Sequence, residues 1–523
     1  MMKQKMGGDS ASLLCVTPNG EVLMDWADPG CCGVEEGEEE NDASVLPFAK
    51  LPDVVVGAET TAARQGDEDA AATTRLAPGA LLASLFSHLE ESKRLELAES
   101  TLLLGSFLRP PFLKNQHASK ATFYMLRPFP SSYLQTSASS SSSSSLRWTE
   151  VEQLIQRFEE HRVLLCPLSL QLLRWLQQFS SSDDFGGFVK HCLERSNLLN
   201  DVNERMLVGV QMELEYAPNM LVVPILSNTL PPFDSTNLVM FLTKTECLIV
   251  DPGASLSAGA PHFLRLLDEF VFNTSSSLPP RTLHIFLTHH HKDHWEGLVA
   301  LSQLDSSSSP SNQRFTVYAH TKTFQRLERL LPSLEGAQAL DLFTNSQKWK
   351  LVSITSNDQI VLSPSSSQED GQGLVLDILQ AEGHTDGHLV LWESKGRTLI
   401  AGDHIVGQGS ASLDAVGGGD MAQYLATTRF LMSLAPRLAV PAHGPPSYRC
   451  VALLKEYLRH RQAREDAIVS SIQAGARNVE DVVAAVYKDI SPALWKPAAA
   501  NVMLHIRKLQ KEEKLPQGFS LSS

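Results

Sequence analysis

The sequence predicts a mixed α/β protein built from more than one domain. The chain has 523 residues, and because single hydrophobic cores rarely exceed about 250–300 residues, roughly three domains are expected. Hydrophobic residues make up 43% of the chain and charged residues 20%, which is ordinary for a globular protein. Between Pro218 and His443, short apolar runs alternate with stretches that carry the 3.6-residue apolar period of amphipathic helices. This alternation predicts the α/β class.

The central region contains seven runs that are typical of strands. They cover residues 237–242, 246–251, 283–289, 315–320, 374–384, 388–393 and 397–403. Helical periodicity predicts helices over 261–272 and 421–434. Several of the strands run directly into His, Asp or Gly. In mixed α/β folds, functional side chains collect at strand ends, so this pattern indicates a site there.

Composition excludes some classes of protein. No apolar run approaches the roughly 18 residues of a membrane-spanning helix, so no membrane partner is expected. The opening MMKQKMGGDSASLL has no apolar core, which argues against a secretory signal. Seven cysteines without a CxxC pair predict reduced thiols. We therefore expect an intracellular, reducing compartment; the cytoplasm fits, and an organelle stays open.

Charge is distributed unevenly along the chain. The net charge is −15, which argues against attraction of a polyanion to the whole surface. From Pro445 to Ser523, however, 12 Lys+Arg stand against 8 Asp+Glu, a balance of +4. The C-terminal segment is therefore the region expected to contact a polyanion such as RNA.

Five separated stretches carry residues that bind metals: LIVDPG, THHHKDH, AEGHTDGH, IAGDH and VPAHGP. Imidazole and carboxylate groups suit zinc, iron or manganese, and one shared carboxylate can hold two ions about 3.5–4 Å apart. The sequence therefore predicts a site for two metal ions, with zinc as the default. The expected ligands are His289, His291, Asp293, His294, His384, Asp403 and His443.

The motif order H-x-H-x-D-H, GHT-x-GH, GD and AHG resembles the metallo-β-lactamase fold superfamily over about Val222 to Pro446. The resemblance implies an αββα sandwich. It assigns one ion to His289, His291 and His384, and the other to Asp293, His294 and His443, with Asp403 between them. Asp251 and His388 are expected to support these ligands, while His290 is expected on the loop surface.

The C-terminal region predicts two helices, over 457–472 and 478–487, and a basic helix over 497–515. This pattern resembles the winged-helix tail of the beta-lactamase-like protein 2 family. This resemblance implies an endoribonuclease that cleaves single-stranded RNA with metal-bound hydroxide. It places the catalytic roles on His289, His291, Asp293 and Asp403. The expected RNA contacts are Arg507, Lys508, Lys511 and Lys514.

Residues 106–126 and 147–176 faintly resemble the later part of a Nudix domain, but the N-terminal region lacks the Nudix box with its metal-binding glutamates. We therefore predict a degenerate, non-catalytic Nudix-like module, and an unrelated α/β regulatory domain remains an alternative. The predicted domains are 1–200, 205–446 (metallo-β-lactamase) and 447–518 (winged-helix-like). The sequence SLLCVTPNGEVLMDW also predicts two strands joined by an Asn-Gly turn.

Two other functions stay open at this point. A thioester hydrolase of the glyoxalase II type would use the same seven ligands. A non-catalytic binding protein would be expected to have lost at least one of them. The sequence gives no oligomeric state and no secure general acid.

Overall fold

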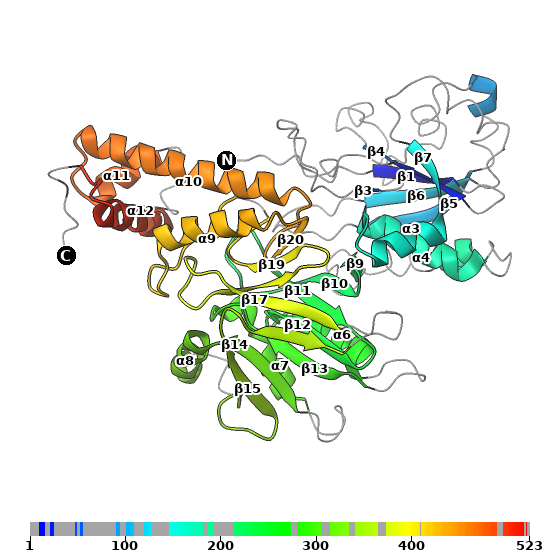
Figure 1. Ribbon diagram of the computed structural model, residues 1–523, viewed down its shortest axis with the longest axis horizontal. Coiled ribbons are helices and arrows are strands. Elements are labelled where there is room, and N and C mark those ends of the chain that lie inside the picture. Colours follow the sequence, from blue (N-terminus) through cyan, green and yellow to red (C-terminus); the bar gives the residue numbers. More distant parts are fainter. Residues whose placement is uncertain are drawn as a thin grey trace, which may run out of the picture. The chain divides into compact units, whose positions relative to one another are not determined.

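The computed structural model divides the chain into two compact units, Lys3–Pro224 and Ile225–Ser523 together with Met1–Met2 (Figure 1). Each unit is described by itself. The structure describes residues 10–15, 21–25, 48–49, 53–55, 90–94, 101–108, 120–126, 146–180, 187–192, 194, 213–272, 280–304, 314–333, 340–363, 373–407, 409–488, 495–516 and 519.

The N-terminal unit contains a four-stranded sheet in the order β4-β1-β6-β5. Strand β1 runs parallel to β6, and β6 runs antiparallel to β5. Two smaller pairs are β2 with β7 and β3 with β8, and two helices, α3 and α4, follow. The bounds are β1 Ser10–Cys15, β2 Glu21–Asp25, β3 Phe48–Ala49, β4 Asp53–Val55, β5 Thr101–Leu108, β6 Lys120–Leu126, β7 Leu146–Glu150, α3 Val151–Glu159, β8 Leu164–Leu165 and α4 Pro167–Ser180.

The two N-terminal strands exist as predicted, but they do not pair with each other. Strand β1 pairs with β4 and β6, whereas β2 pairs with β7. The predicted turn at Asn19-Gly20 lies outside the described residues. The Nudix-like assignment of this region stays a prediction.

Two sheets form the central sandwich. One has seven strands in the order β15-β14-β13-β12-β11-β10-β9, and the other has five in the order β16-β17-β18-β19-β20. All seven predicted strands are confirmed, and β20 is the strand expected before His443, while β9, β10, β15 and β16 were not predicted. The bounds are β9 Leu214–Ala217, β10 Met220–Leu226, β11 Ser235–Leu242, β12 Glu246–Val250, β13 Thr282–Phe286, β14 Phe315–His320, β15 Trp349–Ile354, β16 Gln359–Leu362, β17 Leu374–Gln380, β18 Leu389–Glu393, β19 Thr398–Gly402 and β20 Leu438–Pro441.

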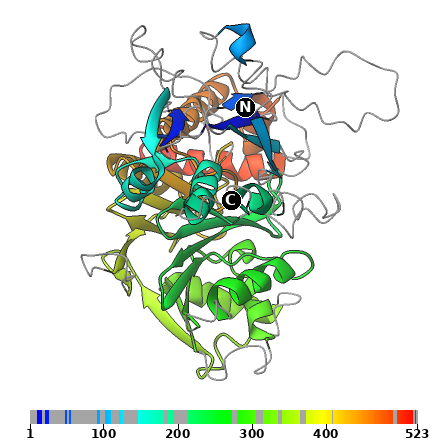
Figure 2. The same cartoon turned by 90° about the vertical axis from the view of Figure 1, so that its right-hand side faces the viewer.

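Helices α6, α7 and α8 lie beside the seven-stranded sheet, and α9 lies beside β19 and β20 (Figure 1 and Figure 2). The two predicted helices are confirmed as α6, which continues into a π-helical turn over Asp268–Phe272, and α9. Their bounds are α6 Ala260–Leu267, α7 Gly297–Ser302, α8 Thr321–Leu330 and α9 Met421–Ser433. Among the described helices, none is long and apolar enough to cross a lipid bilayer.

Strand register determines where the motif residues meet. Strands β12 and β13 are parallel, with Val250 opposite Phe286, so the residues that follow them leave the sheet at the same edge. Strands β19 and β20 are also parallel, with Gly402 opposite Pro441. In each sheet, therefore, two of the motif stretches lie next to each other.

Three C-terminal helices follow: α10 (Cys450–Gln473), α11 (Val479–Val486) and α12 (Trp495–Lys511). Helix α10 ends where Gly475 adopts a φ of 110°, a left-handed conformation that glycine accepts without a steric cost. The apolar faces of the three helices enclose a small core. This arrangement confirms the predicted helix order, but Lys514, which was expected on the last helix, lies beyond the end of α12.

Candidate metal centre

Three imidazole nitrogens converge after strands β13 and β17. Nε2 of His289 lies 2.8 Å from Nδ1 of His291, and Nε2 of His384 lies 3.2 and 3.3 Å from these two atoms. Ligand nitrogens of a tetrahedral zinc ion, with bonds of 2.0–2.1 Å, are roughly 3.3 Å apart. Bare nitrogen lone pairs at this separation repel one another, so the group has the spacing of ligands around one cation.

A second group lies beside the first and is formed by Asp293, His294 and His443. The carboxylate of Asp293 lies 3.9 Å from Nε2 of His294 and 3.3 Å from Nε2 of His443. Both histidine side chains are buried. This group also offers one carboxylate oxygen and two imidazole nitrogens to a common point.

The Asp403 carboxylate lies between the groups. Its Oδ2 is 3.9 Å from Nε2 of His289 and 3.6 Å from Nε2 of His384. Its Oδ1 is 3.5 Å from Nε2 of His294 and 3.3 Å from Nε2 of His443. Buried Asp403 Oδ1 and His294 Nε2 have no hydrogen-bond partner, which is costly unless a cation satisfies them. The donor set therefore fits two metal ions that share one carboxylate.

The second nitrogen of every ligand ring has a fixed partner. Such contacts select the tautomer and hold the ring plane, which prepares the other nitrogen for a metal. The partners are Thr288 Oγ1 for His289 (3.0 Å), Asp414 Oδ2 for His291 (3.0 Å), Asp251 Oδ2 for His294 (2.9 Å), Ser412 O for His384 (2.6 Å) and Ser235 O for His443 (2.9 Å). All five rings are thus oriented by the protein.

Asp251 and His388, the residues predicted to support the ligands, both form hydrogen bonds with the segments that carry the candidate ligands. Asp251 Oδ1 accepts a hydrogen bond from the Thr288 amide, and its Oδ2 accepts one from the Thr288 hydroxyl, both at 2.8 Å. Its Oδ2 also accepts from Nδ1–H of His294, so one buried carboxylate orients two parts of the ligand loop. His388 Nε2 accepts a hydrogen bond from the Asp403 amide at 3.2 Å.

Electrostatics differ between the two groups. Burial, opposed by Asp403 and reinforced by His291, lowers the pKa of His384 to about 4. Burial also lowers the pKa of His294, but the carboxylates of Asp251, Asp403 and Asp293 outweigh it and hold that pKa well above its ordinary value. A metal ligand must be a neutral imidazole. Ion binding at the second group therefore has to displace a proton from His294, whereas the lowered pKa of His384 already favours its neutral form.

Asp414 is a functional neighbour that sequence reasoning missed. It stands alone in a glycine-rich loop, carries no motif, and lies 123 residues from its partner His291 in the sequence. The following glycines provide the only local signal. A Cβ on Gly417 would lie 2.0 Å from Asp414 Oδ2, so that position has no room for a side chain.

The expectation that His290 lies on the loop surface is wrong. Its side chain is 6% exposed, and its Nε2 lies 3.7 Å from Asp414 Oδ2. Burial, reinforced by His291 and Arg326, lowers its pKa to about 3. His290 is a neutral, buried neighbour of the centre.

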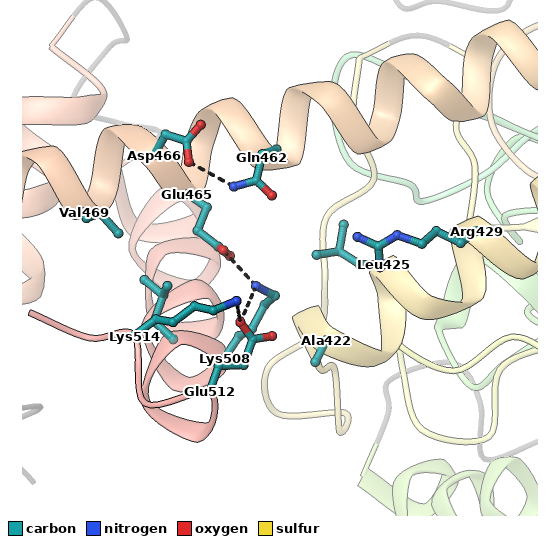
Figure 3. Close-up of a pocket in the computed structure, with 11 residues that line it drawn as sticks. Ala422, Leu425, Arg429, Gln462, Glu465, Asp466, Val469, Lys508, Glu512 and Lys514 are labelled. Atoms are coloured by element: carbon teal, nitrogen blue, oxygen red, sulfur yellow. Dashed lines mark hydrogen bonds and ion pairs between the residues drawn. The ribbon is translucent and has the colours of Figure 1, made fainter.

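Three of the four expected RNA contacts form ion pairs within the protein, and Figure 3 shows those of Lys508 and Lys514. Lys508, whose side chain is 10% exposed, lies 2.7 Å from Glu465 and 3.2 Å from Glu512. Lys514 lies 2.9 Å from Glu512, and Lys511 lies 2.8 Å from Asp420. A cavity of about 420 Å³ that includes Lys508 and Lys514 is thus lined by both signs of charge. Arg507 is exposed.

Two segments of the chain match known protein families. Residues 231–443 match the metallo-beta-lactamase superfamily, and residues 479–517 match the beta-lactamase associated winged helix domain. The chain contains a metallo-β-lactamase domain. The match indicates a metal-dependent hydrolase, and the chain carries clusters of His and Asp side chains that could hold metal ions.

Proteins similar to this chain are known from several organisms. The chain is 33% identical over 147 residues to the beta-lactamase-like protein 2 homolog of Drosophila melanogaster, covering 28% of this chain and 48% of the relative. The Caenorhabditis elegans homolog is 30% identical over 141 residues (27% and 46%). The chain thus spans about half the length of these two relatives.

A more distant relative is the thioesterase pkgB of Emericella nidulans, which is 22% identical over 290 residues (55% and 66%). Among solved structures, a metallo-beta-lactamase family protein from Thermus thermophilus aligns with a TM-score of 0.42 and 20% identity, over 57% of this chain and 94% of that one.

Proposed function

We propose that this protein is a two-metal hydrolase that cleaves single-stranded RNA. The position of Asp403 carries the two-metal part of the proposal, because its two oxygens face two separate ligand groups. The RNA part is supported by the resemblance to the beta-lactamase-like protein 2 family and by the winged helix domain that residues 479–517 of this chain match.

The candidate ligands would be divided between two metal ions. His289, His291 and His384 would hold one ion, and Asp293, His294 and His443 the other. Bound metal ions lower the pKa of a coordinated water from 15.7 toward about 7 and stabilise the negative charge that develops on a phosphoryl group. Thr288 and Asp251 keep the ligand loop in place, so that substrate binding need not reorganise it. The described residues offer no secure proton donor for the leaving group.

The direct test compares substrates at one enzyme concentration. Purified full-length protein, with its metal content measured by elemental analysis, is assayed on single-stranded RNA, on the matching duplex and on S-lactoylglutathione. The proposal expects cleavage of the single strand above the other two. Turnover of the thioester with intact RNA would replace the proposal by the thioesterase alternative, which the relative pkgB favours.

A charge variant tests the role of the C-terminal segment. Replacing Arg507, Lys511 and Lys514 by glutamine is expected to weaken RNA binding and to flatten its salt dependence. Each lost phosphate contact removes about 0.7 from the log–log slope for single strands, so three contacts remove about 2. Filter binding at several salt concentrations measures both quantities.

Lys508 is left intact in this variant because its loss would leave the buried Glu465 carboxylate with only the His505 ring as a partner and destabilise the helical domain. Arg329, an exposed cation on α8, gives the control variant Arg329→Gln. An RNA affinity and a salt slope that both match the control would contradict an RNA-docking role for these cations.

The N-terminal region is expected to be dispensable for the chemistry. All seven ligands lie between His289 and His443, and a chain that begins near Asp201 still contains β9 and β10 of the sandwich. Such a truncated protein is predicted to keep its metal content and hydrolytic activity if circular dichroism shows it to be folded. Magnesium-dependent hydrolysis of nucleoside diphosphates by residues 1–200 would contradict the prediction that this region is non-catalytic.

A further inference from the structure

One loop supplies partners to two of the three histidines in the first ligand group. We call Gly409–Asp420 the glycine loop. Its Ser412 carbonyl accepts a hydrogen bond from His384 Nδ1 at 2.6 Å, and Asp414 Oδ2 accepts one from His291 Nε2 at 3.0 Å. Because these bonds set the tautomers of both rings, the position of the loop decides which nitrogens face the metal.

The glycine loop packs closely against the loop that carries His384. The Asp414 amide donates to the His384 carbonyl at 2.9 Å, and the Asp386 amide donates to the Gly417 carbonyl at 3.0 Å. A Cβ on Gly419 would lie 2.7 Å from the Asp414 carbonyl oxygen. The loop therefore has little room to shift while keeping both histidine partners.

Arg461 of α10 holds one end of this loop. Its side chain is 4% exposed, and its Nη2 donates to the carbonyl of Ala411, immediately before Ser412. The guanidinium lies 5.2 Å from the centre of the Tyr424 ring, and Nη1 lies 3.5 Å from Asn501 Oδ1 on α12. Arg461 thus connects the glycine loop to two of the C-terminal helices.

The environment of Arg461 is unusual for a buried cation. Within the part of the chain that the structure describes, it forms no ion pair with a carboxylate, and its Nε has no hydrogen-bond partner. Burial of an unpaired charge is costly, so packing alone would favour an apolar residue here. The hydrogen bond to the Ala411 carbonyl accounts for a charged residue at this position.

The other end of the glycine loop, at Asp420, also contacts a C-terminal helix. Asp420 Oδ1 accepts hydrogen bonds from the amides of Ala422 and Gln423 and so caps α9, while Asp420 Oδ2 lies 2.8 Å from Lys511 Nζ. The C-terminal helices therefore contact both ends of the segment that orients the first ligand group.

We propose that Arg461 is a positioning residue for the metal centre, which acts by holding the glycine loop so that Ser412 and Asp414 keep His384 and His291 in their ligand tautomers. The C-terminal helices would then contribute to metal affinity as well as to substrate binding. This inference rests on the proposed two-metal centre.

The test is a cobalt(II) titration of the metal-free, full-length protein, followed by visible absorption and calorimetry. Arg461→Met is expected to weaken one of the two sites by about tenfold to a hundredfold, the usual effect of losing an outer partner of a ligand, and to leave the other nearly unchanged. Asp414→Asn is expected to weaken the same site. The double variant should lose little more than Asp414→Asn alone, because both changes act through one loop.

Arg459→Met is the matched control, since Arg459 lies on the same helix, is 72% exposed and pairs with Glu456. Its cobalt affinities are expected to equal those of the unsubstituted protein. Thermal unfolding of each metal-free variant shows whether the fold persists. If Arg461→Met does not fold, Arg461→Lys replaces it, because lysine keeps the charge but lacks the two Nη groups that contact Ala411 O and Asn501 Oδ1.

The outcomes separate the two proposals. An unsubstituted protein that binds fewer than two cobalt ions would contradict the two-metal centre itself. Two cobalt ions with unchanged affinity in the folded Arg461 variant would overturn only the positioning role. Losses that multiply in the double variant would also overturn it, since Arg461 and Asp414 would then act independently.

Discussion

Replacement of Asp403 by alanine is expected to lower metal content from two ions per chain to fewer than one and to abolish hydrolysis. Both ligand groups depend on this side chain, with Oδ2 facing His384 and Oδ1 facing His443. Without it, the two ions would repel each other across a buried space with no anion between them. The loss of affinity should exceed the roughly 100-fold that follows removal of an outer partner. Elemental analysis after gel filtration measures the content.

Asp377→Asn serves as the control, because this carboxylate lies on β17 and contacts Gln359 rather than a ligand. His290→Ala is a poor control, since that side chain is buried beside the centre. Full metal occupancy in the Asp403→Ala protein would show that Asp403 is not the shared ligand.

Asp251→Asn is expected to reduce metal affinity by roughly 10- to 100-fold while the protein stays folded. The carboxylate accepts three hydrogen bonds, from the Thr288 amide, the Thr288 hydroxyl and His294 Nδ1. An asparagine that presents its NH₂ group to His294 would force the ring proton onto Nε2, the atom that faces the metal. The variant should therefore lose the second ion before the first. Stepwise chelator titration with a metal-sensitive dye follows each ion.

A stability control is needed, because Asp251 is buried. Asp341→Asn is suitable, since Asp341 also accepts three side-chain hydrogen bonds, from Ser302, Asn345 and Trp349, at a distance from the ligands in the sequence. Comparable unfolding temperatures with different metal affinities would support the role assigned to Asp251. Equal losses of metal in both variants would indicate a general effect on stability.

The candidate ligands could be located from the sequence because each belongs to a short motif at a strand end. Asp251 follows β12 and Asp403 follows β19 directly, so the prediction of the strands also located the residues. The parallel register of β12 with β13 brings the ends of those two strands together, and the register of β19 with β20 does the same in the other sheet. Local pattern and strand order were sufficient for this part of the molecule.

Residues whose roles depend on distant contacts could not be predicted in this way. Lys508 has the spacing of an exposed cation on an amphipathic helix, yet its partner Glu465 is 43 residues away. Lys511 likewise contacts Asp420, 91 residues away. The burial of His290 depends on how the glycine loop folds over it. In each case the deciding neighbour comes from another element, which periodicity does not reveal.

The strand registers also determine which changes of length the enzyme can tolerate. His289 follows β13 of the seven-stranded sheet and His384 follows β17 of the five-stranded sheet. Their Nε2 atoms lie 3.2 Å apart although the residues are 95 apart in the sequence, because the strand order within each sheet and the packing of the two sheets, and not the length of the connections, place them. Insertions in the connecting segments should therefore leave the ligands in place during divergence. A deletion of one residue within β19 would shift Asp403 by about 3.3 Å and turn the side chains that follow to the opposite face of the sheet. Variation in length among related enzymes is thus expected in their loops and excluded from the strands that end at a ligand.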